Sequence, residues 1–274
     1  GRSAGTRNLP TRTDMDLAYT IAGFTVGFIV GMTGVGGGSL MTPILVLGFG
    51  INPVIAVGTD LLYAAITKST GILFHHKHRN IHWDVVKRLA MGSIPATIIA
   101  IVILKRIHDA GYNYDRLITT TLSIALILTS LVLIFKTRIK KISEQENLAA
   151  VRTVHRKIRK PMTVCCGAMI GILVTLSSVG AGALGAAILL FLHPGLRTIA
   201  IVGTDLAHAV PITLIAGLGH SYMGTVDFTL LIGLLIGSIP GIYLGSKAGT
   251  ALPERITRPV LASMLFLIGV KFAF

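Results

Sequence analysis

Two glycine-rich interruptions determine how this sequence is interpreted. The first, Gly34-Val35-Gly36-Gly37-Gly38, divides an apolar stretch that runs from Leu17 to Leu47. The second, Ser177-Ser178-Val179-Gly180-Ala181-Gly182, divides a similar stretch between Thr163 and Leu192. Each stretch is too long for one straight crossing of a hydrocarbon layer about 30 Å thick. We therefore expect each to be a helix that is broken in mid-membrane and followed by a shorter helical piece.

The composition is that of a membrane protein. Of the 274 residues, 52% are hydrophobic and only 13% are charged, and the mean hydropathy is +0.76. Soluble domains usually carry about 25% charged residues. Apolar runs such as 117–135 and 228–244 are long enough, or nearly so, to cross a bilayer. The sequence predicts an all-α fold, a polytopic membrane helix bundle of about eight spans.

Two short motifs each occur twice at the same interval. Residues 57–61, Val-Gly-Thr-Asp-Leu, recur at 202–206, and residues 92–95, Gly-Ser-Ile-Pro, recur at 237–240. Apolar bias alone does not explain two identical motifs at one interval, so we expect two homologous repeats, each with a glycine-rich broken helix. The expected division is a polar N-terminal tail at 1–16, a first transmembrane repeat at 17–136, a basic linker at 137–160 and a second transmembrane repeat at 161–274.

The net charge of +14 is concentrated beside the apolar runs. Nine of the 25 Lys and Arg residues fall within 136–160, which predicts that this linker is cytoplasmic and touches anionic headgroups. No aromatic-basic module accompanies the charge, so we expect no nucleic-acid partner. The charge pattern leaves two topologies open. The repeats are parallel if each broken helix crosses the membrane once, and inverted if each is re-entrant.

Unwound backbone survives at membrane depth only where protein buries it or it lines a cavity. A helix that starts after such a break points free N–H groups and the positive end of its dipole into that cavity. Glycines let an anion approach the backbone, and serines add hydroxyl donors. We expect one pseudo-symmetric anion site, and the alternative is that the glycines only permit close helix crossing. The substrate-binding candidates at the two breaks are Gly34, Gly36, Gly37, Gly38, Ser39, Ser177, Ser178, Gly180 and Gly182.

Ionisable residues inside the predicted spans form a second group of candidates. Asp60 and Asp205 occupy the same place in the two repeats, each after a threonine, Thr59 or Thr204, and His208 lies one turn beyond Asp205. Charge at the bilayer centre costs at least about 2.5–3.5 kcal/mol, so it needs a partner or a purpose. Three roles are open for the aspartates: hydrogen bonding to the broken helices, carrying a coupling proton, or pairing with a lysine.

Lys68 is the best single candidate for anion contact. It has no charged counterpart in the second repeat, where Thr213 occupies the position. The alternative is that its side chain extends to the membrane edge. The histidines around 75–82 include no carboxylate or Cys partner, so we expect a basic loop there and no metal site. We also expect no cofactor.

These features together resemble the sulfite exporter TauE/SafE family. The likeness is carried by Gly34–Gly38 with Ser39, Pro43, the segment 58–60, the segment 92–95, the basic linker and the weaker second copy. Members often have Thr-Asn-Lys where this chain has Thr59-Asp60-Leu61. The resemblance implies a multi-pass carrier in the bacterial inner (plasma) membrane that moves small anions containing sulfur or carboxylate groups.

The expected function is secondary transport of a small sulfur-containing or organic anion, such as sulfite or sulfoacetate, by alternating access with possible proton coupling. An anion channel or passive pore is the alternative. A membrane-embedded enzyme is disfavoured because the sequence contains no recognisable nucleophile–base arrangement or metal motif. The expected partners are a small anionic substrate and the lipid bilayer. The sequence leaves the anion, the direction of transport and the oligomeric state open.

Overall fold

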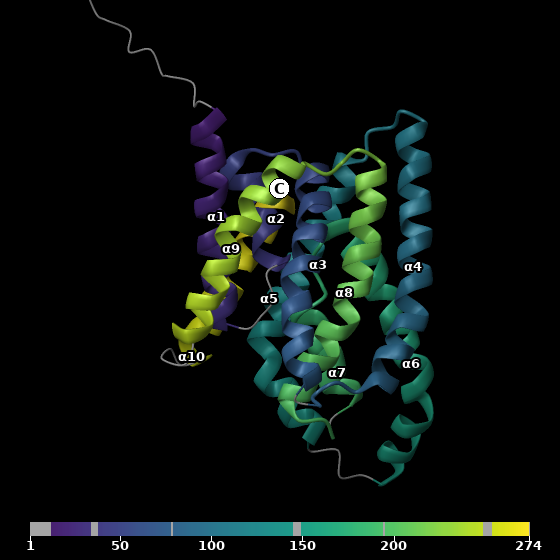
Figure 1. The fold of residues 1–274 in the computed structure, drawn as a ribbon. Coiled ribbons are helices and arrows are strands. Elements are labelled where there is room, and N and C mark those ends of the chain that lie inside the picture. Colours follow the sequence, from purple (N-terminus) through teal and green to yellow (C-terminus); the bar gives the residue numbers. More distant parts are fainter. Residues whose placement is uncertain are drawn as a thin grey trace, which may run out of the picture.

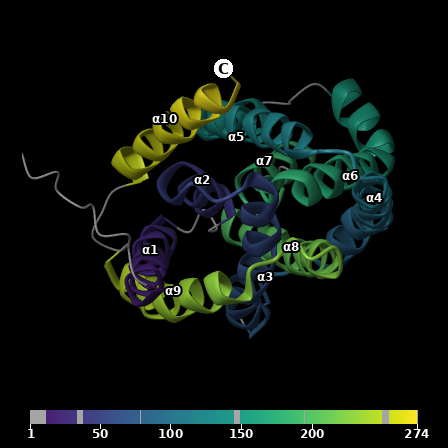
Figure 2. The same ribbon diagram turned by 90° about the horizontal axis from the view of Figure 1, so that it is seen from above.

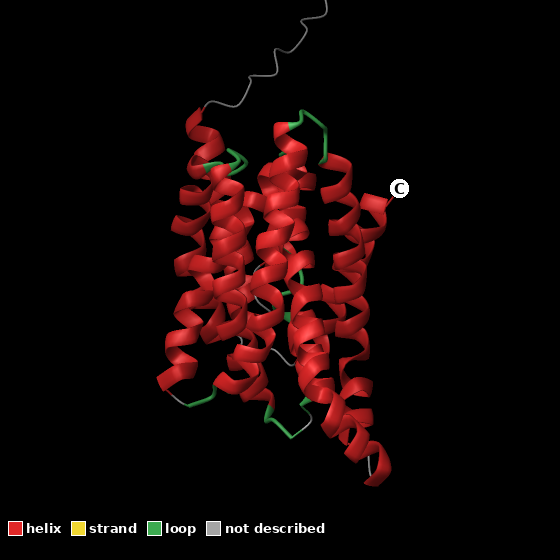
Figure 3. Ribbon diagram, turned by 90° about the vertical axis from the view of Figure 1, so that its right-hand side faces the viewer, coloured by secondary structure: helices red, strands yellow, loops and turns green. Residues whose placement is uncertain are grey.

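The fold was obtained as a computed structural model, which describes residues 12–33, 38–77, 79–144, 149–193, 195–248 and 254–273. Within these ranges the chain is helical and contains no strand, which confirms the all-helical class (Figure 3). The helices are α1 (Arg12–Thr33), α2 (Gly38–Phe49), α3 (Pro53–Lys77), α4 (Trp83–Asp109), α5 (Asp115–Glu144), α6 (Ala149–Ser177), α7 (Ala183–Leu192), α8 (Thr198–Tyr222), α9 (Phe228–Ala248) and α10 (Glu254–Ala273).

The bundle is organised by pairs of helices that come from opposite halves of the chain. The most extensive pairings join α1 to α9, α4 to α6, α5 to α10 and α3 to α8. Seen from above, the short helices α2 and α7 lie near the middle, surrounded by the longer ones (Figure 2). The two halves of the chain therefore interlock and do not form separate lobes.

The two helices that carry the recurring motif, α3 and α8, run antiparallel. The Thr59 hydroxyl near the start of α3 accepts the backbone N–H of Asp227, just beyond the end of α8, at 3.0 Å. The Thr204 hydroxyl near the start of α8 accepts the backbone N–H of His82, just beyond the end of α3, at 3.1 Å. The two contacts occupy matching places in the sequence, since His82 and Asp227 are separated by the same interval as Thr59 and Thr204.

Polar side chains lie inside the bundle and apolar ones face outward. Asp60, Lys68, Asp205 and His208 are at most 4% exposed, whereas large apolar side chains such as Ile239 are exposed. This pattern is the reverse of a soluble protein and suits a lipid surround. Five of the described helices, namely α4, α5, α6, α8 and α9, are long and apolar enough to cross a membrane. The number of crossings, about eight, stays a prediction.

Glycines set the spacing of the closest helix pairs. A Cβ at Gly23, Gly27 or Gly31 of α1 would strike the backbone of α9, and one at Gly237 or Gly241 of α9 would strike α1. The pair α4 and α6 is packed in the same way through Gly92, Gly167 and Gly171. Small residues spaced four apart allow helices to approach to backbone contact within a membrane. Close crossing is thus provided by glycines in the helix interiors.

The basic linker is more ordered than a plain connection. Helix α5 continues to Glu144 and α6 begins at Ala149, so most of the predicted linker 137–160 is helical. Lys, Arg and Glu are good helix formers, which explains why the two helices extend beyond their apolar parts. Helix α1 begins at Arg12, inside the predicted polar tail 1–16.

The glycine packing can be tested with one methyl group. Replacing Gly27 with Ala would place a Cβ 2.6 Å from the Ser238 carbonyl oxygen. We expect the free energy of unfolding to fall by about 1–3 kcal/mol, the usual cost of overpacking a tight interface. Thermal unfolding of purified protein in detergent measures the change.

Gly48→Ala is the matched control. At this position only a side-chain atom of Ile44, 3.8 Å away, is near the added Cβ, and alanine favours the helix. Equal melting temperatures for the two variants would show that α1 and α9 are not held at backbone contact.

Candidate functional site

The break between α6 and α7 is built from residues with positive φ. Ser178 has φ +58°, Gly180 +124° and Gly182 +142°. The two glycines adopt angles that L side chains rarely tolerate, which explains why this segment ends one helix and starts another. Helix α7 begins at Ala183 with Gly182 as its N-cap, and no side chain caps it. As at any helix start, the first amides of α7 have no partner within the helix.

Lys68 of α3 reaches this break. Its Nζ donates a hydrogen bond of 2.8 Å to the Ala181 carbonyl oxygen, and its side chain is only 4% exposed. The alternative that Lys68 extends to the membrane edge is therefore wrong. No ion pair within 4.0 Å joins Lys68 to a carboxylate among the described residues, although Asp60 and Asp205 both lie within electrostatic range.

Asp60 is bonded by one hydroxyl group and faced by a second, from two other segments. Its Oδ2 accepts a hydrogen bond of 2.5 Å from the Thr42 hydroxyl of α2. The Ser178 hydroxyl at the break faces the same carboxylate without completing a hydrogen bond. Asp60 thus connects α3 to one short helix and to the break before the other.

Asp205 has a different environment, although it is the counterpart of Asp60. Its carboxylate is packed directly against the Cα of Gly185 in the first turn of α7, so that a Cβ there would collide with an Asp205 oxygen. Its Oδ1 is buried without a hydrogen-bond partner. The charged group near it is Lys68.

A second pair of matching contacts surrounds the aspartates. The Nε2 atom of His208 shares a 2.8 Å hydrogen bond with the Ser93 hydroxyl of α4. At the matching places in the other half, the Tyr63 hydroxyl of α3 lies beside Ser238 of α9. Both serines belong to the recurring segments 92–95 and 237–240, which places those segments against the site.

Five unpartnered side-chain atoms belong to the polar residues described above. They are buried and lack any hydrogen-bond partner within the described structure. Each belongs to Asp60 or to a residue that lies within electrostatic range of Lys68 or Asp60 or faces the Asp60 carboxylate. Elsewhere in the described chain only Thr129 and Arg159 have such atoms. Buried polar atoms without partners are costly, so this group of residues is the candidate site of the described chain. The atoms are Asp60 Oδ1, Tyr63 Oη, Ser178 Oγ, Asp205 Oδ1 and His208 Nδ1.

The predicted site residues are only partly brought together. Gly34, Gly36 and Gly37 lie outside the described residues, and Gly38 and Ser39 open α2 without described side chains. Ser177 bonds its hydroxyl to the backbone of Leu173 and Val179, so it stabilises the end of α6 locally. Ser178, with Gly180 and Gly182 behind it, is the part of the predicted set that lies with Lys68 and Asp60.

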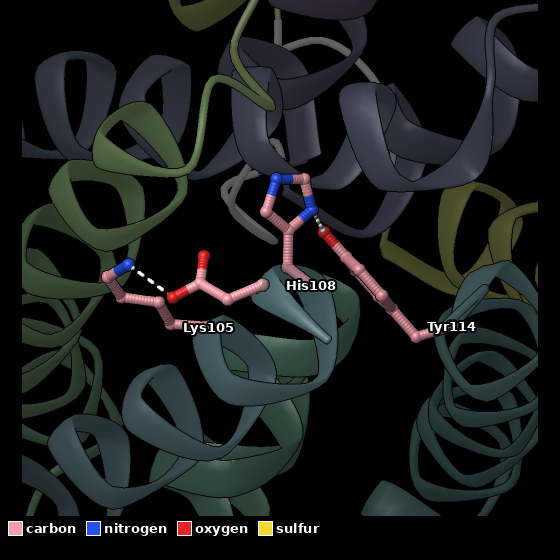
Figure 4. A network of polar contacts seen from close by, with 4 residues as sticks. Lys105, His108 and Tyr114 are labelled. Atoms are coloured by element: carbon pink, nitrogen blue, oxygen red, sulfur yellow. Dashed lines mark hydrogen bonds and ion pairs between the residues drawn. The ribbon is translucent and has the colours of Figure 1, made fainter. Parts of the chain in front are cut away.

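An open cavity of about 470 Å³ lies at the end of the bundle where α3 starts. The connections α2–α3, α4–α5 and α8–α9 line it through residues such as Asn52, Tyr114 and Thr225 (Figure 1). At its wall the Tyr114 hydroxyl lies 3.3 Å from His108 Nδ1, and Lys105 nearby is paired with Asp109 (Figure 4). Because Val54 of α3 also lines it, the cavity is within two helical turns of Asp60 along the chain.

Four residues of the site were not among the sequence candidates. Thr42, Tyr63, Ser93 and Ser238 contact or face the predicted ionisable residues. The repeat interval could have identified Tyr63, because it matches His208, and the Gly-Ser-Ile-Pro motifs contain both serines. Thr42 has no such signal.

The crossed threonine contacts lead to a paired prediction. Thr59→Val and Thr204→Val each remove the acceptor of a loop amide from the other half of the chain. We expect each to lower the free energy of unfolding by about 1 kcal/mol, the usual net worth of a hydrogen bond. Thr121→Val is the control, since that exposed hydroxyl bonds only within its own helix. Thermal unfolding in detergent measures all three, and a loss confined to one of the two site variants would contradict the matched arrangement.

Comparison with known proteins identifies the family of the chain. The family model for the sulfite exporter TauE/SafE matches residues 19–272. The probable membrane transporter protein YjnA of Bacillus subtilis is 35% identical over 257 residues, which cover 94% of this chain and 99% of that protein. The probable membrane transporter protein MJ0441 of Methanocaldococcus jannaschii is 28% identical over 268 residues, 91% of this chain and 92% of its own length. No solved structure matches the chain. The chain is therefore a multi-pass membrane protein that belongs to the sulfite exporter TauE/SafE family of transporters.

Proposed function

We propose that this protein is a secondary transporter of a small sulfur-containing or organic anion and that the anion binds where Lys68 meets the break before α7. The observation that carries the proposal is the group of unpartnered polar atoms around a buried ammonium. A buried cation beside a helix N-terminus favours negative charge through both its own charge and the helix dipole. Family membership supports transport rather than catalysis.

The hydrogen bond of Lys68 to the Ala181 carbonyl can be replaced by one to a bound anion. A carbonyl oxygen satisfies one of the three donors of the ammonium. An anion oxygen would form a stronger, charge-assisted hydrogen bond with the same group. The Ser178 hydroxyl, which has no hydrogen-bond partner, would add a neutral donor to the anion.

The chain is proposed to consist of two homologous repeats of inverted topology. The antiparallel course of α3 and α8, which carry the same motif, supports inversion rather than a parallel arrangement. The matching pairs α1–α9 and α4–α6, both packed through glycines, support it as well. Inverted repeats allow two equivalent states, in which the site opens first to one side and then to the other.

The sidedness follows from charge. The end of the bundle that holds Lys77, Arg79, Lys87 and Arg88, together with the linker 137–160, is the more basic and is proposed to face the cytoplasm of a cell with this protein in its inner (plasma) membrane. The open cavity at the start of α3 would then face outward. We propose alternating access, with the cavity giving entry on the outer side.

A binding assay with purified protein tests the site. Sulfite, sulfate, thiosulfate, sulfoacetate, taurine and acetate are added to wild-type protein and to Lys68→Met, and the shift in melting temperature is followed. We expect selective stabilisation of the wild type by at least one anion. We also expect the affinity of Lys68→Met to fall at least about tenfold, because a hydrogen bond to a charged group is worth about 1.5–3 kcal/mol.

Lys105→Met is the matched control, since Lys105 is an exposed lysine paired with Asp109. Lys68→Arg keeps the positive charge and separates its loss from changes in packing. Stabilisation of Lys68→Met equal to that of wild type, or no stabilisation of folded wild type by any anion, would overturn the proposed site. Saturable counterflow in proteoliposomes supports a carrier, whereas unsaturable flux without counterflow would support the channel.

A further inference from the structure

We infer that Asp205 carries a proton that accompanies the anion through the site, while Asp60 stays ionised and acts as a fixed anchor. This assignment rests on the proposed function and distinguishes two carboxylates that are equivalent in the sequence. It is based on their different contacts in the folded chain.

The anchor role of Asp60 follows from its hydroxyl donor. Thr42 donates to its Oδ2 at 2.5 Å, and the Ser178 hydroxyl faces the same carboxylate. A hydrogen bond donated to a carboxylate favours the ionised form. Protonation of Asp60 would weaken this bond and loosen the connection between α3 and α2.

Asp205 has no such donor. The Oδ1 atoms of both aspartates are buried without a partner, but no hydrogen bond from the described residues reaches either oxygen of Asp205, and Gly185 packs against it without offering a side chain. Burial disfavours the ionised form of a carboxyl group relative to its protonated form, and most strongly where no hydrogen-bond donor reaches it. A proton on Asp205 would relieve that cost and would need no rearrangement of α7.

The surrounding charges agree with this choice. Helices α3, α4, α6 and α7 pack against α8, and of their described titratable groups Lys68 alone lies within electrostatic range of Asp205. His208 on α8 itself faces the same ammonium, and a second positive charge there would be repelled. His208 is therefore a poorer proton carrier than Asp205.

The charge balance explains why the proton must move with the anion. With both aspartates ionised, Asp60, Lys68 and Asp205 carry more negative than positive charge, so an incoming anion meets net repulsion. A proton taken from the solution onto an Asp205 oxygen removes that excess before the anion binds. After the site opens to the other side, both leave, and the ionised carboxylate returns empty. Anion and proton thus travel in the same direction.

The experiment uses the full chain in proteoliposomes with labelled sulfoacetate as the probe. Its sulfonate and carboxylate both stay ionised near neutral pH, so a pH gradient does not change the probe itself. In wild-type protein we expect an acid-outside gradient to drive accumulation inside the vesicles. In Asp205→Asn we expect accumulation to be lost while sulfoacetate counterflow continues at a rate comparable to wild type.

Three further variants make the outcome decisive. Asp109→Asn, an exposed carboxylate outside the site, should accumulate the probe as wild type does. Asp60→Asn should lose counterflow as well as accumulation, because the anchor itself is gone. His208→Gln should retain proton-driven accumulation even where its rate falls, and it tests the assignment if Asp205→Asn proves unstable.

Proton-driven accumulation by folded Asp205→Asn, or its loss in His208→Gln, would overturn the assignment of Asp205. Absence of sulfoacetate counterflow in wild-type protein, after no anion of the panel stabilises it, would overturn the proposed function itself. Counterflow in wild type without any effect of the pH gradient would leave the anion site standing and remove the proton from the mechanism.

Discussion

The non-helical backbone of the break between α6 and α7 is the constraint on which the rest of the structure depends. Peptide groups that leave a helix at membrane depth have no water to bond, so protein must enclose them. Lys68 covers the Ala181 carbonyl, and Gly185 brings the start of α7 against Asp205. The outer helices α1, α4, α5, α6, α9 and α10 then separate this polar centre from lipid. A polar centre and an apolar exterior are two consequences of the same requirement.

The two halves of the site are related without being alike. The threonine contacts and the serine neighbours match across the halves. Lys68, however, corresponds in sequence to the uncharged Thr213. Thr42 donates a hydrogen bond to Asp60, and no described residue donates one to Asp205. The matching contacts join the helices of the two halves. The residues that differ between the halves are those beside the unpartnered polar atoms.

The sequence predicts the scaffold better than the contacts made within it. Apolar runs located the helices, and the interruption at 177–182 lies where α6 ends and α7 begins. Lys68 could be singled out because a lone lysine in an apolar run is costly to bury unless it has a polar partner or a function. Its bond to Ala181 could not be predicted, since the two residues are brought together only by packing of helices from opposite halves. Tyr63 and Ser238 could have been found from the repeat interval, and the basic composition of 137–160 gave no indication of how far α5 and α6 extend into it.

The pairing of α1 with α9 has a consequence for how the protein is made. Helix α1 leaves the ribosome before the other described helices, yet the glycine-lined face of α1 meets its partner only when residues near Gly237 have been synthesised. During most of translation that face is bordered by lipid or by the insertion machinery. The crossed contacts of Thr59 and Thr204 also require residues from both halves. Packing of α1 against its partner therefore follows insertion of α9, and nascent chains that end before α9 should lack the α1–α9 interface.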